Sequence, residues 1–178
     1  MKSDILLPDP SFLNQLIKLV LRLKTGIQPK TIELFSKTFL FSGIMSAELE
    51  RHFQRYQLSQ PGFLVLVILR TNPDQIWTPT ELAEAIGVRP PTMTGITDTL
   101  EKQGLIERRA STSDRRKSYI LLTKIGKKRL GQILPDHFNR LQQAFGHLAT
   151  PEFLNQFSSV IDALKLAVES LNNEVNNG

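Results

Sequence analysis

The stretch that decides the fold is residues 78–122, TPTELAEAIGVRPPTMTGITDTLEKQGLIERRASTSDRRKSYILL. It begins with a capping-box pattern, in which Thr78 is a favoured helix N-cap, Pro79 suits the first helical position and Glu81 follows the cap by three residues. The pattern predicts a short helix. Gly87 tolerates the left-handed conformation found at helix C-termini, so we expect the helix to end there.

A second helix is predicted from Pro90 to about Gln103, because Pro90 and Pro91 suit its first positions and Gly104 follows it. Its apolar side chains recur at helical spacing, at Met93, Ile96 and Leu100. Two short helices joined by a tight turn with a glycine are typical of the helix-turn-helix motif. The second helix of that motif can enter the major groove of DNA.

Two strand-like runs follow at 105–109 and 119–122, and residues 110–118 between them are polar and basic. They predict a β-hairpin with a charged tip, in other words a wing. The dipeptide 76–77 could add a short third strand. The predicted fold class is therefore mainly α with a small β-hairpin (α+β).

Five sequence segments go beyond this general pattern: LAEAIGV (82–88), PTMT (91–94), LEKQGLIERR (100–109), DRRKSYILLT (114–123) and Gly126. Together they resemble the MarR family of winged helix-turn-helix transcriptional regulators. A helix-turn-helix alone is a weak signal. The order Glu-Lys-x-Gly-Leu-Ile-x-Arg-Arg, then Asp-Arg-Arg, then Leu-Thr-x-x-Gly is a specific one.

The resemblance implies a single MarR-like domain over residues 1–178 that forms a homodimer. Residues 10–58 and 124–176 would be helices mainly for dimerisation, and residues 59–123 would be the DNA-binding lobe. The implied partner is double-stranded DNA with a pseudo-palindromic operator. Repression is the commoner mode in the family, and release by a small aromatic, phenolic or anionic effector is the implied mechanism.

The candidate DNA contacts on the second helix are Arg89, Pro91, Thr92, Thr94, Gly95, Thr97 and Asp98. Threonine hydroxyls can hydrogen-bond phosphates or base edges, and their methyl groups can contact a thymine methyl. Arg89 departs from the family, in which a serine commonly caps this helix. Gly95 replaces a larger side chain, and two interpretations stay open: close approach of the backbone to DNA, or a position that tolerates glycine.

The candidates in the wing are Asp114, Arg115, Arg116 and Lys117. The resemblance implies that Arg116 enters the minor groove and that Asp114 orients it, and narrow A/T-rich minor grooves do favour arginine. Phosphate contacts are expected from Arg108, Arg109, Lys124, Lys127 and Lys128. Residues 101–130 carry ten basic and three acidic residues in a chain of net charge +5, which is typical of a phosphate-binding surface. A merely solvated face is the alternative.

The flanking segments are predicted to be helical. Residues 10–24 and 29–56 both have apolar faces, and we expect the first to pack on this chain or on a partner subunit rather than on a membrane surface. Another helix should run from 124 to about 148, with a kink at Pro135.

The last helix carries a heptad seam at Leu154, Phe157, Ile161, Leu164, Val168, Leu171 and Val175. Such a seam packs against another helix, within the chain or across a dimer.

Composition excludes several classes of site and protein. The chain has no cysteine, which rules out disulfides, thiolate metal sites and cysteine redox switches. No apolar run reaches membrane-spanning length and the N-terminus lacks the form of a signal peptide, so a cytoplasmic protein without a membrane partner is expected. No cofactor or metal is expected, since His52, His137 and His147 lack metal-ligand spacing.

Six residues are candidate contacts for an effector: Phe39, Phe53, Tyr56, Phe63, Arg70 and Trp77. The aromatic rings could line an apolar pocket, and a basic side chain there would suit a phenolate or a carboxylate. The plain alternative is that these aromatic residues are ordinary core.

An enzyme is the competing function class. Glu84, Asp98 and Glu101 could supply carboxylates, but solvated helix faces explain them, and capping explains Glu81. There is no nucleophile motif and no phosphate-binding glycine loop. Two alternatives that are not enzymes stay open: an effector-independent architectural DNA-binding protein, and a protein-interaction module.

Overall fold

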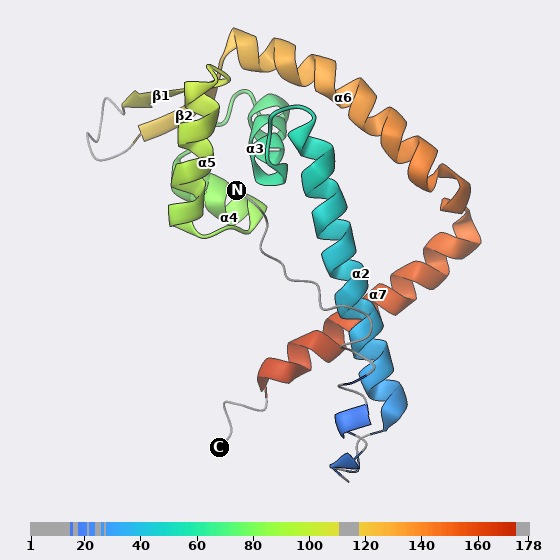
Figure 1. The fold of residues 1–178 in the computed structure, drawn as a ribbon. Coiled ribbons are helices and arrows are strands. Elements are labelled where there is room, and N and C mark those ends of the chain that lie inside the picture. The colour runs from blue at the N-terminus through green and yellow to red at the C-terminus, as the bar shows by residue number, and fades with distance from the viewer. Residues whose placement is uncertain are drawn as a thin grey trace. The chain divides into compact units, whose positions relative to one another are not determined.

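The computed structural model describes residues 15, 18–20, 22–23, 26, 28–110 and 118–173. The chain divides into two compact units, Met1–Leu130 and Gly131–Gly178. Most of the helix predicted at 10–24 lies outside the described residues. The elements are α2 (Pro29–Gln54), α3 (Gln60–Thr71), α4 (Pro79–Ile86), α5 (Pro90–Lys102), β1 (Ile106–Ala110), β2 (Ser118–Leu122), α6 (Lys124–Phe145), a 3₁₀ turn (Gly146–Leu148) and α7 (Pro151–Asn173) (Figure 1). The mainly helical fold with one small hairpin confirms the predicted fold class.

The capping signals of the sequence set the helix boundaries. The Thr78 hydroxyl accepts from the backbone N–H of Glu81 at 3.3 Å, and the Glu81 carboxylate accepts from the backbone N–H of Thr78 at 2.7 Å. This is the predicted capping box. Gly87 ends α4 with φ 71°, in the left-handed conformation. Two helix ends differ by more than one residue. α2 ends at Gln54 rather than Tyr56, because the chain turns there and Gln57 has φ 58°. α6 ends at Phe145 rather than about 148, and a 3₁₀ turn follows it.

The hairpin also forms as predicted. Strands β1 and β2 pair antiparallel, from Ile106 opposite Leu122 to Ala110 opposite Ser118. The expected third strand is reduced to one bridge, in which the Ile120 N–H donates to the Trp77 carbonyl at 2.8 Å.

The core of the first unit surrounds α3. This helix packs against α2, α4, α5 and β2. Side chains from α3, α4, α5, β1 and β2 are almost fully buried there: Val65, Leu66, Leu82, Met93, Leu100, Ile106 and Ile120. Fully burying one such side chain contributes about 1.5–3 kcal/mol to folding. Packing therefore fixes the buried sides of α4 and α5, and their other sides are left for function.

A tight junction joins the start of α6 to the turn after α5. The Thr123 N–H donates to the Leu105 carbonyl at 3.1 Å, and the Thr123 hydroxyl lies 2.7 Å from the Gly104 carbonyl. The same hydroxyl accepts from the Gly126 N–H at 2.9 Å, which caps α6. A Cβ at Gly126 would overlap the Leu105 carbonyl oxygen. This close approach explains why the motif Leu-Thr-x-x-Gly needs glycine at its end.

In the second unit, Thr150 caps α7 by accepting from the Phe153 N–H at 3.2 Å. The predicted seam is largely exposed. Its exposed members are Leu154, Phe157, Ile161, Val168 and Leu171. Leu164 is half-buried, and Val175 lies outside the described residues. The prediction of a single domain over the whole chain stays a prediction.

In the part of the chain that the structure describes, no helix is both long enough and apolar enough to span a membrane.

Gly126→Ala is expected to lower the free energy of unfolding by about 1–3 kcal/mol or more, because the added methyl group overlaps the Leu105 carbonyl. Urea unfolding followed by circular dichroism measures the change. Gly131→Ala is the matched control in the same helix: its Cβ would meet no atom within 4 Å, so this variant should gain up to about 1 kcal/mol. Equal stability of the two variants would contradict the close contact.

Candidate nucleic-acid interface

The two helices α4 and α5 form the helix-turn-helix and pack on each other. The turn between them depends on Gly87, after which the Val88 N–H donates back to the Ala83 carbonyl at 3.0 Å. Pro90 then starts α5, and Arg89 is its N-cap without a side-chain capping bond. The Arg89 side chain is exposed, so it is available at the N-terminus of the helix.

One side of α5 is exposed and mostly uncharged. Its exposed residues are Pro91, Thr92, Thr94, Gly95 and Thr99. The Thr94 hydroxyl donates to the Pro90 carbonyl at 3.2 Å, and the Thr99 hydroxyl donates to the Gly95 carbonyl at 2.8 Å. Each hydroxyl oxygen can still accept a bond, and each methyl group is free for apolar contact. Sequence analysis missed Thr99, although its spacing of four residues from Gly95 puts it on the same side of the helix.

The structure corrects the expectation for Thr97, which is fully buried and cannot present its side chain to DNA. Its hydroxyl lies 3.0 Å from the Met93 carbonyl and accepts from the Arg108 guanidinium at 2.6 Å. Arg108 was expected to contact a phosphate group of DNA. Instead it bonds to Asp98 at 2.5 Å and to Glu101 at 3.2 Å. Both Asp98 and Arg108 are therefore engaged within the protein.

The alternation of buried and exposed residues along β1 indicates that the Arg108 side chain points inward. Ile106 is buried, Glu107 is exposed, Arg108 is half-buried and Arg109 is exposed. Arg108 thus shares the inward face of β1 with Ile106, since side chains alternate along a strand. Arg109 lies on the outer face and pairs with Glu107 at 2.6 Å.

Three lysines add positive charge at the start of α6. Lys124, Lys127 and Lys128 are all exposed, and they belong to the same compact unit as α5 and the hairpin. The wing-tip candidates Asp114, Arg115, Arg116 and Lys117 lie outside the described residues.

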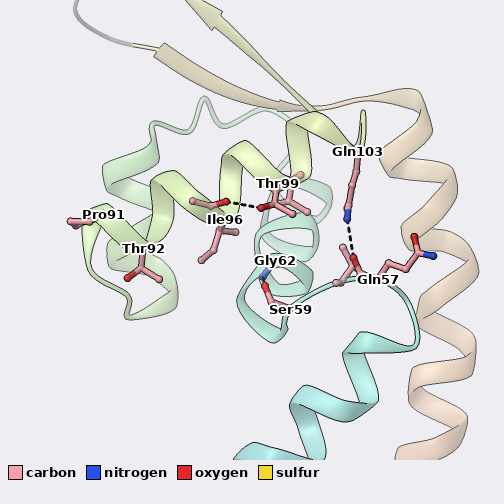
Figure 2. Close-up of a pocket in the computed structure, with 11 residues that line it drawn as sticks. Gln57, Ser59, Gly62, Pro91, Thr92, Ile96, Thr99 and Gln103 are labelled. Atoms are coloured by element: carbon pink, nitrogen blue, oxygen red, sulfur yellow. Dashed lines mark hydrogen bonds between the residues drawn. The ribbon is translucent and has the colours of Figure 1, made fainter. Parts of the chain in front are cut away.

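Two hollows adjoin the end of α2. The first, the α3–α5 hollow, has a volume of about 650 Å³ and is lined by Gln57, Leu58, Ser59, Gly62, Pro91, Thr92, Gly95, Ile96, Thr99, Leu100 and Gln103 (Figure 2). The second, the Arg129 hollow, has a volume of about 550 Å³ and is lined by Tyr56, Gln57, Gln103, Leu105, Ile125 and Arg129.

Two side chains hold the turn after α2. Gln103, at the end of α5, donates to the Gln57 carbonyl at 3.0 Å, as Figure 2 shows. Arg129 of α6 donates to the Tyr56 carbonyl at 3.1 Å. Neither Gln103 nor Arg129 stood out in the sequence, because their roles depend on how α2, α5 and α6 meet.

The structure does not gather the six effector candidates at either hollow. Tyr56 lines the Arg129 hollow, and the other five line neither. Phe53 and Phe63 are buried core residues whose rings lie 4.7 Å apart. Phe39 and Arg70 are exposed. Trp77 is half-buried, and its buried indole N–H finds no hydrogen-bond partner among the described residues.

Among the described residues, no group of three or more histidine, aspartate or glutamate side chains could hold a metal ion. His137 of α6 is buried, and this burial lowers its pKa, which favours the neutral imidazole.

Comparison with known proteins identifies the family. Residues 58–118 match the MarR family model. The chain is 36% identical to the HTH-type transcriptional repressor YetL of Bacillus subtilis over 127 residues, which are 71% of this chain and 76% of the relative. The chain belongs to the MarR family. It is also 37% identical over 95 residues to the transcriptional repressor MprA of Escherichia coli, covering 53% of this chain and 54% of MprA.

Solved structures share the fold. The MarR family regulator Sco3205 from Streptomyces coelicolor, solved in complex with DNA, matches with a TM-score of 0.69 at 24% identity, over 82% of this chain and 90% of that chain. The present MarR protein is thus a transcriptional regulator with a winged helix-turn-helix fold, and it is not an enzyme.

Gly95→Ala is expected to raise the free energy of unfolding by up to about 1 kcal/mol, because a Cβ there meets no atom within 4 Å and alanine favours the helix. Gly87→Ala is the control. Its position is equally open, but φ is 71°, so this variant should lose stability. Urea unfolding measures both, and a loss of stability at Gly95 would contradict the prediction.

The duplex affinity of Gly95→Ala then separates the two interpretations of this glycine. Weaker binding would support close approach of the backbone to DNA, and unchanged binding would show that the position only tolerates glycine.

Proposed function

We propose that this protein is a homodimeric repressor that binds a pseudo-palindromic double-stranded DNA operator in a sequence-specific way. One observation carries the proposal. The helix α5 has one side buried in the core and the other side exposed, with small hydrogen-bonding residues such as Thr92 and Thr94 beside Gly95. Such a surface can approach base edges closely in the major groove. A repressor of this kind works on genomic DNA, so the proposal places it in the cytoplasm.

Phosphate contacts would position α5 on the duplex. Lys124, Lys127 and Lys128 are exposed at the start of α6, and Arg109 is exposed on the outer face of β1. Such residues add affinity without reading sequence. In the proposal Arg116 enters the minor groove and Asp114 orients its guanidinium, while Arg115 and Lys117 add phosphate contacts.

The exposed apolar side chains of α7 support a homodimer. A heptad seam packs along a second helix, and large exposed apolar patches mark interaction surfaces. α2 also exposes Leu34, Phe35, Phe39, Phe41 and Ile44. Two subunits would then place two α5 helices about one DNA turn apart, which matches a pseudo-palindromic site.

We propose the Arg129 hollow as the effector site. Its lining includes Tyr56, the apolar Leu105 and Ile125, and the basic Arg129. An aromatic carboxylate or phenolate that paired with Arg129 would compete with the Tyr56 carbonyl, which now accepts from that guanidinium. Gln57 and Gln103 line the same hollow and tie the end of α2 to the end of α5. A ligand there could therefore shift the protein toward a state that does not fit DNA.

The dimer predicts a mass of about twice 20.2 kDa in sedimentation equilibrium. Ile161→Glu on the seam should raise the dissociation constant at least about tenfold, because burying an unpaired carboxylate costs several kcal/mol. Ser159→Glu, an exposed residue on the opposite side of α7, is the control and should stay dimeric. A monomeric wild type with intact DNA binding would contradict the dimer.

Duplex binding should depend steeply on salt. If the dimer contacts roughly 6–10 phosphates, affinity should fall by about 10³–10⁵ between 50 and 200 mM salt. Lys127→Ala should weaken binding to all duplexes about equally and reduce the salt slope by about one per site removed. Fluorescence anisotropy with labelled duplexes measures both effects. A flat salt response, or preference for single strands, would argue against the proposed function.

Salicylate and larger aromatic acids should raise thermal stability and weaken duplex binding. At one hundred times its dissociation constant a ligand stabilises by about 2.7 kcal/mol, and by reciprocity DNA must weaken ligand binding by the same factor. Arg129→Gln should abolish both effects, whereas Arg70→Gln, an exposed arginine outside the hollow, should abolish neither. Stabilisation without a change in DNA affinity would mean that the site is not a switch. No response across a broad panel would favour an effector-independent DNA-binding protein.

A further inference from the structure

We propose that Arg108 is a positioning residue, a role that rests on the proposed function. It acts on DNA recognition through the acidic residues of α5, and its guanidinium does not contact phosphate. Arg108 lies on β1, and the residues it binds all lie on one side of α5, so one side chain joins the hairpin to the recognition helix.

The bonds of Arg108 leave little of its guanidinium for DNA. Its Nη2 lies 2.6 Å from the Thr97 Oγ1 and 2.5 Å from an Asp98 Oδ1, and its Nη1 lies 3.2 Å from a Glu101 Oε2. The Arg108 backbone N–H also donates to the other Glu101 oxygen at 3.2 Å. We call Arg108, Thr97, Asp98 and Glu101 the Arg108 clasp.

Burial distinguishes Arg108 from the arginine beside it. The Arg108 side chain is 30% exposed, whereas that of Arg109 is 68% exposed and pairs with Glu107 on its own strand. Arg108 also sits opposite Ile120, which is buried, so its strand position faces the core. Arg109 is therefore the better placed of the two for phosphate.

The clasp has an electrostatic consequence. Asp98 and Glu101 place two carboxylates on the helix that is proposed to enter the major groove, and each is more than a third exposed. Unpaired, they would repel the phosphates of DNA. The fork of a guanidinium can bond both carboxylates at once, which offsets this repulsion and fixes both side chains.

The clasp has a geometric consequence as well. Core packing holds the buried side of α5 through Met93 and Leu100, and the directional bonds of the clasp add a second restraint on rotation about the helix axis. Four hydrogen bonds from one residue of β1 fix which side of α5 faces the hairpin. Together with core packing, the clasp therefore fixes the rotation of α5, and this rotation determines where Thr92 and Thr94 lie relative to the bases.

Two variants with opposite charge changes test the clasp. Arg108→Ala removes one positive charge, and Asp98→Ala with Glu101→Ala removes two negative charges, yet both break the bonds between the Arg108 guanidinium and the two carboxylates. The probes are a duplex that the wild type recovers from genomic fragments and a scrambled duplex of the same length and composition. Anisotropy at fixed salt gives the discrimination ratio, which is the dissociation constant for the scrambled duplex divided by that for the recovered duplex. Circular dichroism confirms that each variant is folded.

Both variants should reduce this ratio by about tenfold, which is the discrimination that one well-placed side chain provides at a base pair. Arg108→Lys should lose discrimination too, because a single ammonium cannot reproduce the fork. The control Arg109→Ala should weaken both duplexes equally and leave the ratio unchanged. If Arg108→Ala does not fold, the double variant of Asp98 and Glu101, which keeps the arginine, decides the question by itself.

The opposite pattern would overturn the clasp. If Arg108→Ala weakens both duplexes and the double variant tightens both, with the ratio unchanged in each, only charge matters and Arg108 is an ordinary phosphate contact. An unchanged ratio in Arg108→Lys together with the double variant would overturn it equally. If the wild type itself binds the two duplexes equally, the proposed sequence-specific function is wrong, and Arg108 has no sequence recognition to act on.

Discussion

The contact between Gly126 and the Leu105 carbonyl is the constraint on which the DNA-binding lobe depends. Leu105 lies between α5 and β1, so this contact fixes three elements at one point: the end of the recognition helix, the start of the hairpin and the first turn of α6. Thr123 adds bonds to the Gly104 and Leu105 carbonyls and caps α6. Backbone carbonyls cannot move independently of their chain, so the junction leaves little freedom to α5.

With its end fixed, α5 has two very different sides. Met93, Thr97 and Leu100 are buried, and Arg108 holds the acidic edge from β1. The remaining side, around Thr92 and Gly95, is left small and exposed. A helix that reads DNA needs both properties, because a rigid support keeps the reading side in a productive position. Gln103 and Arg129 hold the turn after α2. In the proposed mechanism, a ligand in the Arg129 hollow would act on α5 through these two side chains.

Much of the lobe could be predicted from sequence, because its signals are local. The Thr78 capping box, the glycines at 87 and 104 and the two short strands each depend on neighbouring residues, and the structure confirms the elements they predict. The roles of Thr97 and Arg108 could not be predicted in this way, because they arise where β1 meets α5. The spacing of Ile106 and Arg108 did indicate an inward side chain, but a basic run is more readily interpreted as phosphate-binding. The effector residues stay a prediction, because aromatic content does not reveal which rings pack on one another, as Phe53 and Phe63 do.

Selection of bound fragments from genomic DNA, followed by sequencing, tests the central claim most directly. If two α5 helices read the major groove as a symmetric pair, the recovered fragments should share an inverted repeat whose half-sites lie about 10 base pairs apart, centre to centre. Double substitution of Thr92 and Thr94 by alanine should alter that motif while the protein still binds duplexes. Recovery of fragments with no common motif, or of an unchanged motif from the double variant, would contradict sequence reading by α5.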